Sequence, residues 1–112
     1  MMNISERLSA EELERLLGSE DEQEVIEALM YSVFNIDDPE WLQEKCRNLI
    51  CSEKSLNVRG LAVTCLGHIA RMHKKININL TVPLLMELAK DQDLSGRASD
   101  ALDDIEQFVK NE

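Results

Sequence analysis

Long hydrophobic runs are missing from this 112-residue sequence. Its uncharged apolar stretches are far shorter than the ~20 residues that cross a bilayer. The N-terminal sequence MMNISERLSAEELERL lacks the basic segment and following apolar segment of a secretory signal. None of the three cysteines forms a CxxC pair, which predicts small apolar fillers in a reducing compartment rather than a disulfide framework. We therefore expect a cytoplasmic protein without a membrane partner.

Basic residues are also scarce, because 12 Lys and Arg stand against 22 Asp and Glu, for a formal net charge of −10. This excess argues against a protein that binds nucleic-acid duplexes, since such proteins gain much of their affinity from Lys and Arg on phosphates. With 44% hydrophobic and 30% charged residues, the sequence is typical of one folded domain and not of a disordered acidic tail. We therefore expect no nucleic-acid partner, and a basic partner if the partner is charged.

The charges are unevenly distributed along the chain. Residues 1–44 have a net charge of −11, residues 45–90 of +6 and residues 91–112 of −5. Two interpretations remain open. The acidic flanks attract the basic centre across neighbouring helices, or they present a negative potential to a cationic ligand and speed its encounter.

Hydrophobic residues recur with helical periodicity almost throughout, and no segment alternates for long enough to predict a strand. Helix starts are predicted from polar caps and from proline. In chain order they are Ser9–Glu12, Ser19–Glu22, Asp38 with Pro39, Ser55 or Asn57, Thr81–Pro83, and Asp93 or Ser95. The longest predicted helix has an apolar stripe from Val58 to Met72. The predicted fold class is all-α.

An internal repeat becomes visible when the sequence is compared with itself. At an offset of 36 residues, Leu66 falls on Leu102 and Ile69 on Ile105. Three helix pairs, at about 4–36, 39–74 and 77–110, share this apolar pattern, and each has a face that a neighbouring pair would cover. We therefore expect one domain, a short α-solenoid of about three helix pairs. A compact six-helix bundle is the alternative.

Several segments resemble HEAT repeats. Asn57–Ala70 (NVRGLAVTCLGHIA) is similar to the second helix of such a repeat, Leu94–Ile105 is a degenerate copy of it, and Pro83–Leu88 is similar to a first helix. The longer stretch Val58–Val109 resembles small bacterial HEAT-like immunity proteins, which are encoded beside polymorphic or contact-dependent growth inhibition toxins. This resemblance implies a HEAT-like solenoid that binds and neutralises a cognate toxin.

Residues suited to catalysis or metal binding form no convincing site in the sequence. Asp91–Gly96 is similar to the opening of a calcium loop, but Leu102 occupies the position of the bidentate acid. His68 and His73 are five residues apart, so they point in different directions on a helix and cannot share a metal ion. Cys65 lies in the apolar stripe, where a thiol is usually buried and inert. We expect no enzyme, no metal and no cofactor.

A surface for a protein partner is the remaining candidate site. Its predicted residues are Glu24, Glu27, Tyr31, His68, Asp100, Asp103 and Asp104. The three aspartates share one helical face, and the second helices of a helical-repeat stack commonly line one side of it. The 36-residue offset places Thr64 level with Asp100. A plain solvated face is the alternative interpretation of these acids.

The function predicted from these features is binding to another protein. An acidic surface would cover the active or substrate-binding face of a cationic toxin, and the basic groove of a nuclease is an obvious complement. The alternative is a non-catalytic adaptor subunit of a larger complex. We expect a monomer when the protein is free, and we expect Trp41 to be a lid over the core rather than an interface anchor.

Overall fold

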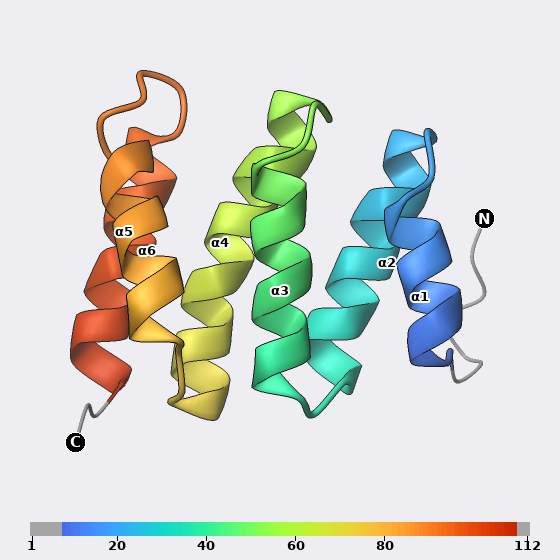
Figure 1. Cartoon of the computed structure of the whole chain (residues 1–112), viewed down its shortest axis with the longest axis horizontal. Helices are drawn as coiled ribbons and strands as arrows, with labels where there is room; N and C mark the ends of the chain where they lie inside the picture. Colours follow the sequence, from blue (N-terminus) through green and yellow to red (C-terminus); the bar gives the residue numbers. More distant parts are fainter. Residues whose placement is uncertain (1–7, 110–112) are drawn as a thin grey trace.

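Six helices follow one another in the computed structural model, which describes residues 8–109. They are α1 (Ala10–Leu17), α2 (Glu22–Asn35), α3 (Pro39–Ile50), α4 (Leu56–His73), α5 (Ile78–Leu88) and α6 (Ser95–Phe108) (Figure 1). The described residues form no strand, and none of their helices is both long and apolar enough to cross a bilayer. The predicted all-α fold is confirmed.

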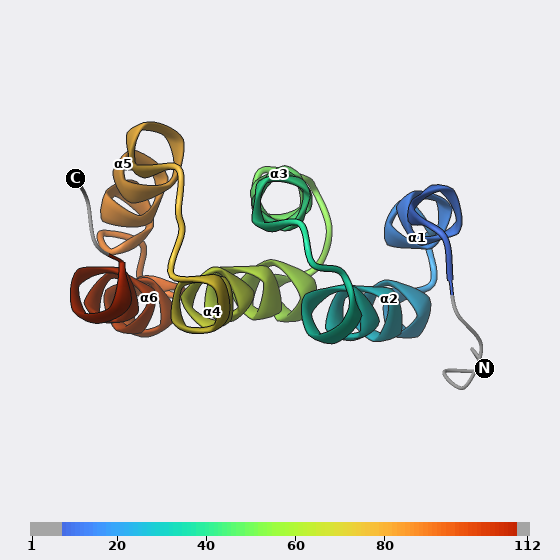
Figure 2. The same ribbon diagram turned by 90° about the horizontal axis from the view of Figure 1, so that it is seen from below.

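The helices are arranged in two layers. Seen from below, α2, α4 and α6 lie side by side in one row, whereas α1, α3 and α5 stand farther apart on one side of that row (Figure 2). Because α4 packs against both α2 and α6, the row is continuous. The resulting slab, with extents of 36 × 31 × 18 Å, is a short helical solenoid rather than a bundle around one axis. Its division into units at about 4–36, 39–74 and 77–110 stays a prediction, and residues 4–7 and 110 lie outside the described residues. The HEAT-like character of these units also stays a prediction.

Three of the predicted helix starts are confirmed by their hydrogen bonds. Ser9 and Glu12 form a capping box, in which each side chain accepts a bond from the backbone N–H of the other residue (3.1 and 2.9 Å). The bond that the Glu12 carboxylate accepts from the Ser9 N–H favours its charged form and lowers the pKa of Glu12. Asp38 accepts a bond from the Trp41 N–H (3.1 Å) ahead of α3, and Ser55 caps α4.

The start of α2 differs from its prediction. The cap is Asp21, whose carboxylate accepts a bond from the Gln23 N–H (3.0 Å). Ser19 instead closes the turn before the helix, because its hydroxyl accepts a bond from the Asp21 N–H (2.9 Å) and donates one to Glu24 (2.6 Å). Since both side chains are short and polar, the sequence does not distinguish their roles.

The starts of the last two helices were predicted too late or from the wrong residue. The α5 helix begins at Ile78 with Asn77 as its cap, so Pro83 lies inside the helix instead of opening it. No side chain caps α6, because the carboxylate of Asp91 takes the N–H groups of Asp93 and Leu94 in the preceding turn (2.8 and 3.1 Å). The same turn explains the calcium-like spacing without a metal ion.

The hydrophobic core lies between the two layers. Its members with no more than 2% exposure include Leu13, Leu29, Leu42, Leu66, Leu85 and Ala101, one from each helix. The predicted stripe on α4 is buried at Val58 and Ile69, but Met72 is 47% exposed. Met72 follows His68 by four residues and therefore lies on the outward face of the helix.

Two of the three cysteines fill the core as predicted. Cys46 and Cys65, on α3 and α4, are fully buried. The hydrogen bond with Cys65, together with burial, raises the pKa of the Cys46 thiol well above its ordinary value, so this thiol stays protonated. The prediction is wrong for Cys51, which is exposed because it follows the last residue of α3 and lies where the chain turns into solvent.

Candidate partner-binding surface

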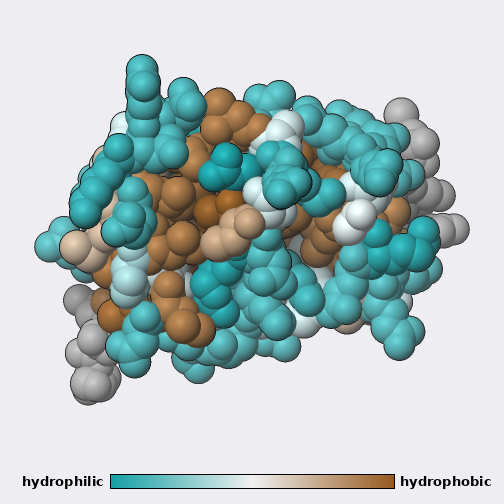
Figure 3. All heavy atoms as spheres, turned by 45° about the horizontal axis from the view of Figure 1, so that its top comes forward, coloured by the Kyte–Doolittle hydropathy of each residue, from teal (hydrophilic) through white to brown (hydrophobic). Residues whose placement is uncertain are grey.

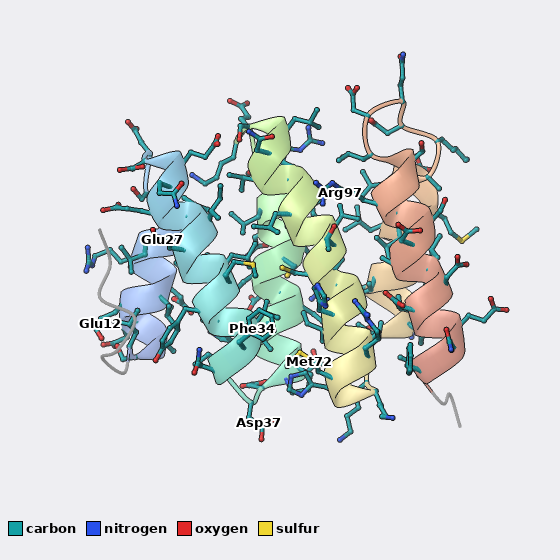
Figure 4. The ribbon with its side chains drawn as sticks, turned by 180° about the vertical axis from the view of Figure 1, so that it is seen from behind. Glu12, Glu27, Phe34, Asp37, Met72 and Arg97 are labelled. Atoms are coloured by element: carbon teal, nitrogen blue, oxygen red, sulfur yellow. The ribbon has the colours of Figure 1, made fainter. Side chains whose placement is uncertain are left out.

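The outward side of the α2, α4 and α6 row, here called the second-helix face, forms a continuous surface. Viewed from behind, it presents Glu27 and Phe34 on α2, Met72 on α4 and Arg97 near the seam with α6 (Figure 4). It includes both acidic and basic side chains, whereas the residues predicted from the sequence include no Lys or Arg. The surface is therefore mixed in charge and partly apolar.

Four residues form a connected row across this face. The ring of Phe34 lies 6.3 Å from that of His68, between centroids, at a tilted angle of 49°. Arg71 lies 3.0 Å from His68, between Nη2 and Nδ1, and makes an ion pair with Asp104, between Nε and Oδ2 at 3.6 Å. A guanidinium group can only donate, so the bond to His68 requires Nδ1 to be unprotonated. The row therefore links α2 to α6 over the surface of α4.

Two glycines on α4 let α6 side chains approach closely. A Cβ atom at Gly67 would lie 2.6 Å from Oδ2 of Asp104 and 3.4 Å from the Cα of Ala101. A Cβ atom at Gly60 would lie 2.9 Å from Nε of Arg97. These glycines are seven residues apart and share one side of the helix. Each one makes room for one charged side chain of α6.

The charged side chains above these glycines also have partners on α4. Arg97 donates a hydrogen bond through Nη1 to the hydroxyl of Thr64 (2.6 Å). The corresponding partner of Asp104 is Arg71, described above. Thr64, which the 36-residue offset aligns with Asp100, thus contacts Arg97, one helical turn before Asp100 on α6. Both α6 side chains are held across the seam between α4 and α6.

The predicted aspartates are in two different environments. Asp104 is half-buried and ion-paired. Asp100 and Asp103 are exposed, and neither carboxylate makes a hydrogen bond or ion pair with another described residue. Their full negative charge therefore remains available to a partner.

The predicted residues of α2 are divided between the face and the edge of the molecule. Glu27 lies on the second-helix face, where it accepts a bond from Gln23 (3.2 Å) (Figure 4). Glu24 accepts the hydroxyl of Ser19, and the hydroxyl of Tyr31 accepts the N–H of Leu8 (3.1 Å). Since α4 separates α2 from α6, the α2 residues do not form one cluster with the aspartates.

Trp41 belongs to α3, in the other layer, and its side chain contacts α1. Its indole N–H donates to Glu14 (3.1 Å), and Nζ of Lys45 lies 5.4 Å from the ring centroid. The half-buried ring packs against the core, as expected for a lid. Trp41 is therefore engaged within the molecule rather than presented on the second-helix face.

Phe34, Arg71 and Arg97 were not predicted from the sequence to be parts of this surface. Only a weak signal was available, the spacing of Gly60 with Thr64 and of Gly67 with Arg71 on one helix. Each pair is four residues apart, so each glycine precedes a polar side chain on the same side. The α6 partners of these pairs become evident only when the two helices are placed side by side.

A second apolar area lies on the other side of the slab. With the top of the molecule turned forward, hydrophobic surface gathers at the left, the side of α5, among hydrophilic side chains (Figure 3). Leu80 and Met86 of α5 are 54% and 56% exposed. They are six residues apart, and therefore point about 120° away from each other on the helix. No group of three His, Cys, Asp or Glu side chains suited to a metal ion occurs among residues 8–109.

Comparison with known proteins gives an informative similarity to a solved structure. No protein-family model matches the chain, and no curated protein sequence matches it either. A chain in a solved structure described as "Crystal structure of CDI complex from Cupriavidus taiwanensis LMG 19424" is 30% identical. The match covers 94% of each chain, with a TM-score of 0.82. This chain belongs to the same family as that chain of the CDI complex.

The shared length has a direct structural consequence. With 94% of both chains aligned, the similarity includes both layers of helices and is not confined to one helix pair. The second-helix face is therefore part of the family fold. On this fold, the present sequence places two carboxylates without partners among the described residues, two arginines held by intramolecular bonds, and the exposed side chains of Phe34 and Met72. Surfaces that combine exposed apolar side chains with charged ones suit contact with another protein.

Proposed function

We propose that this chain is an immunity protein of a contact-dependent growth inhibition (CDI) system, which binds a cognate toxin and neutralises it without catalysis. The observation that supports this most is the 30% identity over 94% of each chain to a chain of a CDI complex. A CDI complex pairs a toxin with its immunity protein. The resemblance of Val58–Val109 to HEAT-like immunity proteins favours the immunity role for this chain.

The charge of the chain supports a cationic toxin. The net charge is −10, and Asp100 and Asp103 are exposed without partners among the described residues. A nuclease binds its substrate phosphates through a basic groove, so a surface with unpaired carboxylates would be attracted to that groove and would cover it. We propose that the second-helix face does this in the cytoplasm of the cell that makes both proteins.

Growth protection tests the proposed function. The toxin domain encoded beside this chain is expressed from an inducible promoter, with and without this chain, and growth is followed. We expect arrest when the toxin is expressed alone and normal growth when both are present. Arrest in the presence of the folded chain would overturn the proposal. A stable complex with a neighbour that is harmless when expressed alone would instead indicate an adaptor subunit.

The acidic part of the proposal requires a kinetic measurement. In Asp100→Asn/Asp103→Asn the association rate constant at low salt should fall about three- to tenfold, and the difference from the wild type should shrink at high salt. Glu11→Gln/Glu40→Gln is the matched control, because both glutamates are exposed but lie on α1 and α3. If the two double variants associate at the same rate at low salt, the aspartates do not attract the toxin.

A further inference from the structure

We infer that Phe34 and Met72 form the apolar anchor at which the partner packs, with the Phe34–His68–Arg71–Asp104 row fixing the anchor in place. This inference rests on the proposed function and adds to it the position and chemistry of the contact. The partner that fits is a cationic protein surface with an apolar pocket bordered by Lys or Arg side chains.

The anchor consists of two large apolar side chains that the fold leaves outside. Phe34 is 58% exposed near the end of α2, and Met72 is 47% exposed near the end of α4. His68 contacts the ring of Phe34 and lies one helical turn before Met72 on the same side of α4. Both side chains are on the second-helix face, close to the C-terminal ends of α2 and α4 (Figure 4).

The surroundings of the anchor are already ordered in the free protein. The imidazole of His68 is bonded to Arg71, whose guanidinium is held by Asp104 in the space above Gly67. A partner that packs on Phe34 therefore meets a preset ring and preset charges, and little further ordering of this surface is needed on binding. Aromatic side chains in such positions often dominate the affinity of an interface.

Carboxylates on two sides of the anchor determine which partner fits. Asp100 and Asp103 on α6 are unpaired among the described residues. Before α3, the side chain of Asp37 is 97% exposed and lies 3.6 Å from His73, the residue that follows Met72. Arg71, the base beside the anchor, is engaged by Asp104, so these carboxylates favour a partner whose pocket is rimmed with Lys or Arg.

The rival surface is α5, with exposed Leu80 and Met86. These two side chains point in different directions, and the single charged residue of that helix, Glu87, is near Lys90 (3.9 Å). The α5 surface therefore lacks both a shared apolar direction and a fixed pattern of charge. We assign the contact to the second-helix face for these reasons.

The test compares dissociation rates from the immobilised toxin domain encoded beside this chain. In Phe34→Ala and Met72→Ala the dissociation rate constant should rise about tenfold or more, because packing at the interface is lost. The association rate constant should change little, since no charge is altered. Met86→Ala is the matched control, because that side chain is as exposed as Phe34 but lies on α5.

Each outcome leads to a separate conclusion. If the wild-type chain fails to bind the toxin domain, the proposed function is overturned. If the wild type binds while Phe34→Ala and Met72→Ala dissociate at its rate, the anchor is wrong and the proposed function stands. Faster dissociation of Met86→Ala alone would move the contact to α5. Thermal unfolding of each variant shows whether the fold is retained, which we expect because these side chains contribute little to the core.

Discussion

Between the first and second helix pairs, charged side chains make most of the polar cross-connections, whereas the connections between the second and third pairs include a buried amide. On the first side, Glu14 of α1 contacts Lys45 of α3 (3.0 Å) and accepts the indole N–H of Trp41 (3.1 Å). Near the other ends of the helices, Lys54 donates to the carbonyl of Ser19 (2.8 Å). Most of these groups can exchange their partner for water.

The second junction is built around a buried amide. Gln43 of α3 is 1% exposed, and its Oε1 accepts bonds from the Asn77 N–H (2.7 Å) and the Thr81 hydroxyl (3.3 Å). Its Nε2 donates to the carbonyl of Pro39 (2.9 Å). The seam of α4 and α6 adds the close contacts at the two glycines described above. The first junction should therefore respond to pH and salt, and the second to changes of shape or hydrogen bonding.

The largest effect is expected from Gln43→Leu at the second junction. The substitution keeps a side chain of similar size but leaves the Asn77 N–H and the Thr81 hydroxyl without the oxygen that they share. Losing these partly buried bonds should lower the free energy of unfolding by about 3 kcal/mol. Urea denaturation of the variant and the wild type measures this difference.

Asn48→Leu is the control for this change, because Asn48 is exposed on the same helix. It should alter the free energy of unfolding by less than about 0.5 kcal/mol. Equal effects of the two variants would mean that the buried amide does not distinguish the junctions.

A smaller effect is expected from Gly67→Val at the seam of α4 and α6. The new side chain would displace Asp104 and press on Ala101, whose Cα would lie 3.4 Å from the added Cβ. We expect a loss of about 2 kcal/mol in the free energy of unfolding, typical of overpacking. Gly96→Val is the control, since a Cβ there meets nothing within 4 Å. A stable Gly67→Val variant would show that α6 can move away from α4 at little cost.

The sequence was sufficient for features that depend on neighbouring residues. The Ser9 capping box, Asp38 before Pro39 and the cap at Ser55 were all found where local pattern places them. The start of α5 was missed because Asn77 gives a weaker signal than Pro83. A proline in the second turn of the helix was interpreted as part of a start at Thr81–Pro83. Local signals therefore predicted most helices and misplaced some of their ends.

The candidate surface was less predictable because it depends on neighbours that are distant in the sequence. The periodicity placed Met72 inside, since an apolar residue on the edge of a stripe has the same pattern whether or not a neighbouring helix covers it. Likewise, the charge of Asp104 gave no indication that Arg71 balances it. The sequence provided the acids of the face, and the packing of α6 on α4 was needed to find the bases and the exposed anchor.

The smallest effect is expected at the first junction, from Glu14→Gln. The hydrogen bond with Lys45, followed by that with Trp41, lowers the pKa of Glu14 below its ordinary value of 4.5. A lowered pKa in the folded state gives a stabilisation that is complete above the ordinary pKa and is lost as the pH falls through the lowered value. The variant should therefore unfold at a slightly lower temperature than the wild type at pH 7 but at the same temperature in strong acid. Glu11→Gln is the control on the same helix. If the difference between Glu14→Gln and the wild type stays constant down to strong acid, or persists in high salt, the charge of Glu14 does not join the first two helix pairs, and the contrast between the junctions is not electrostatic.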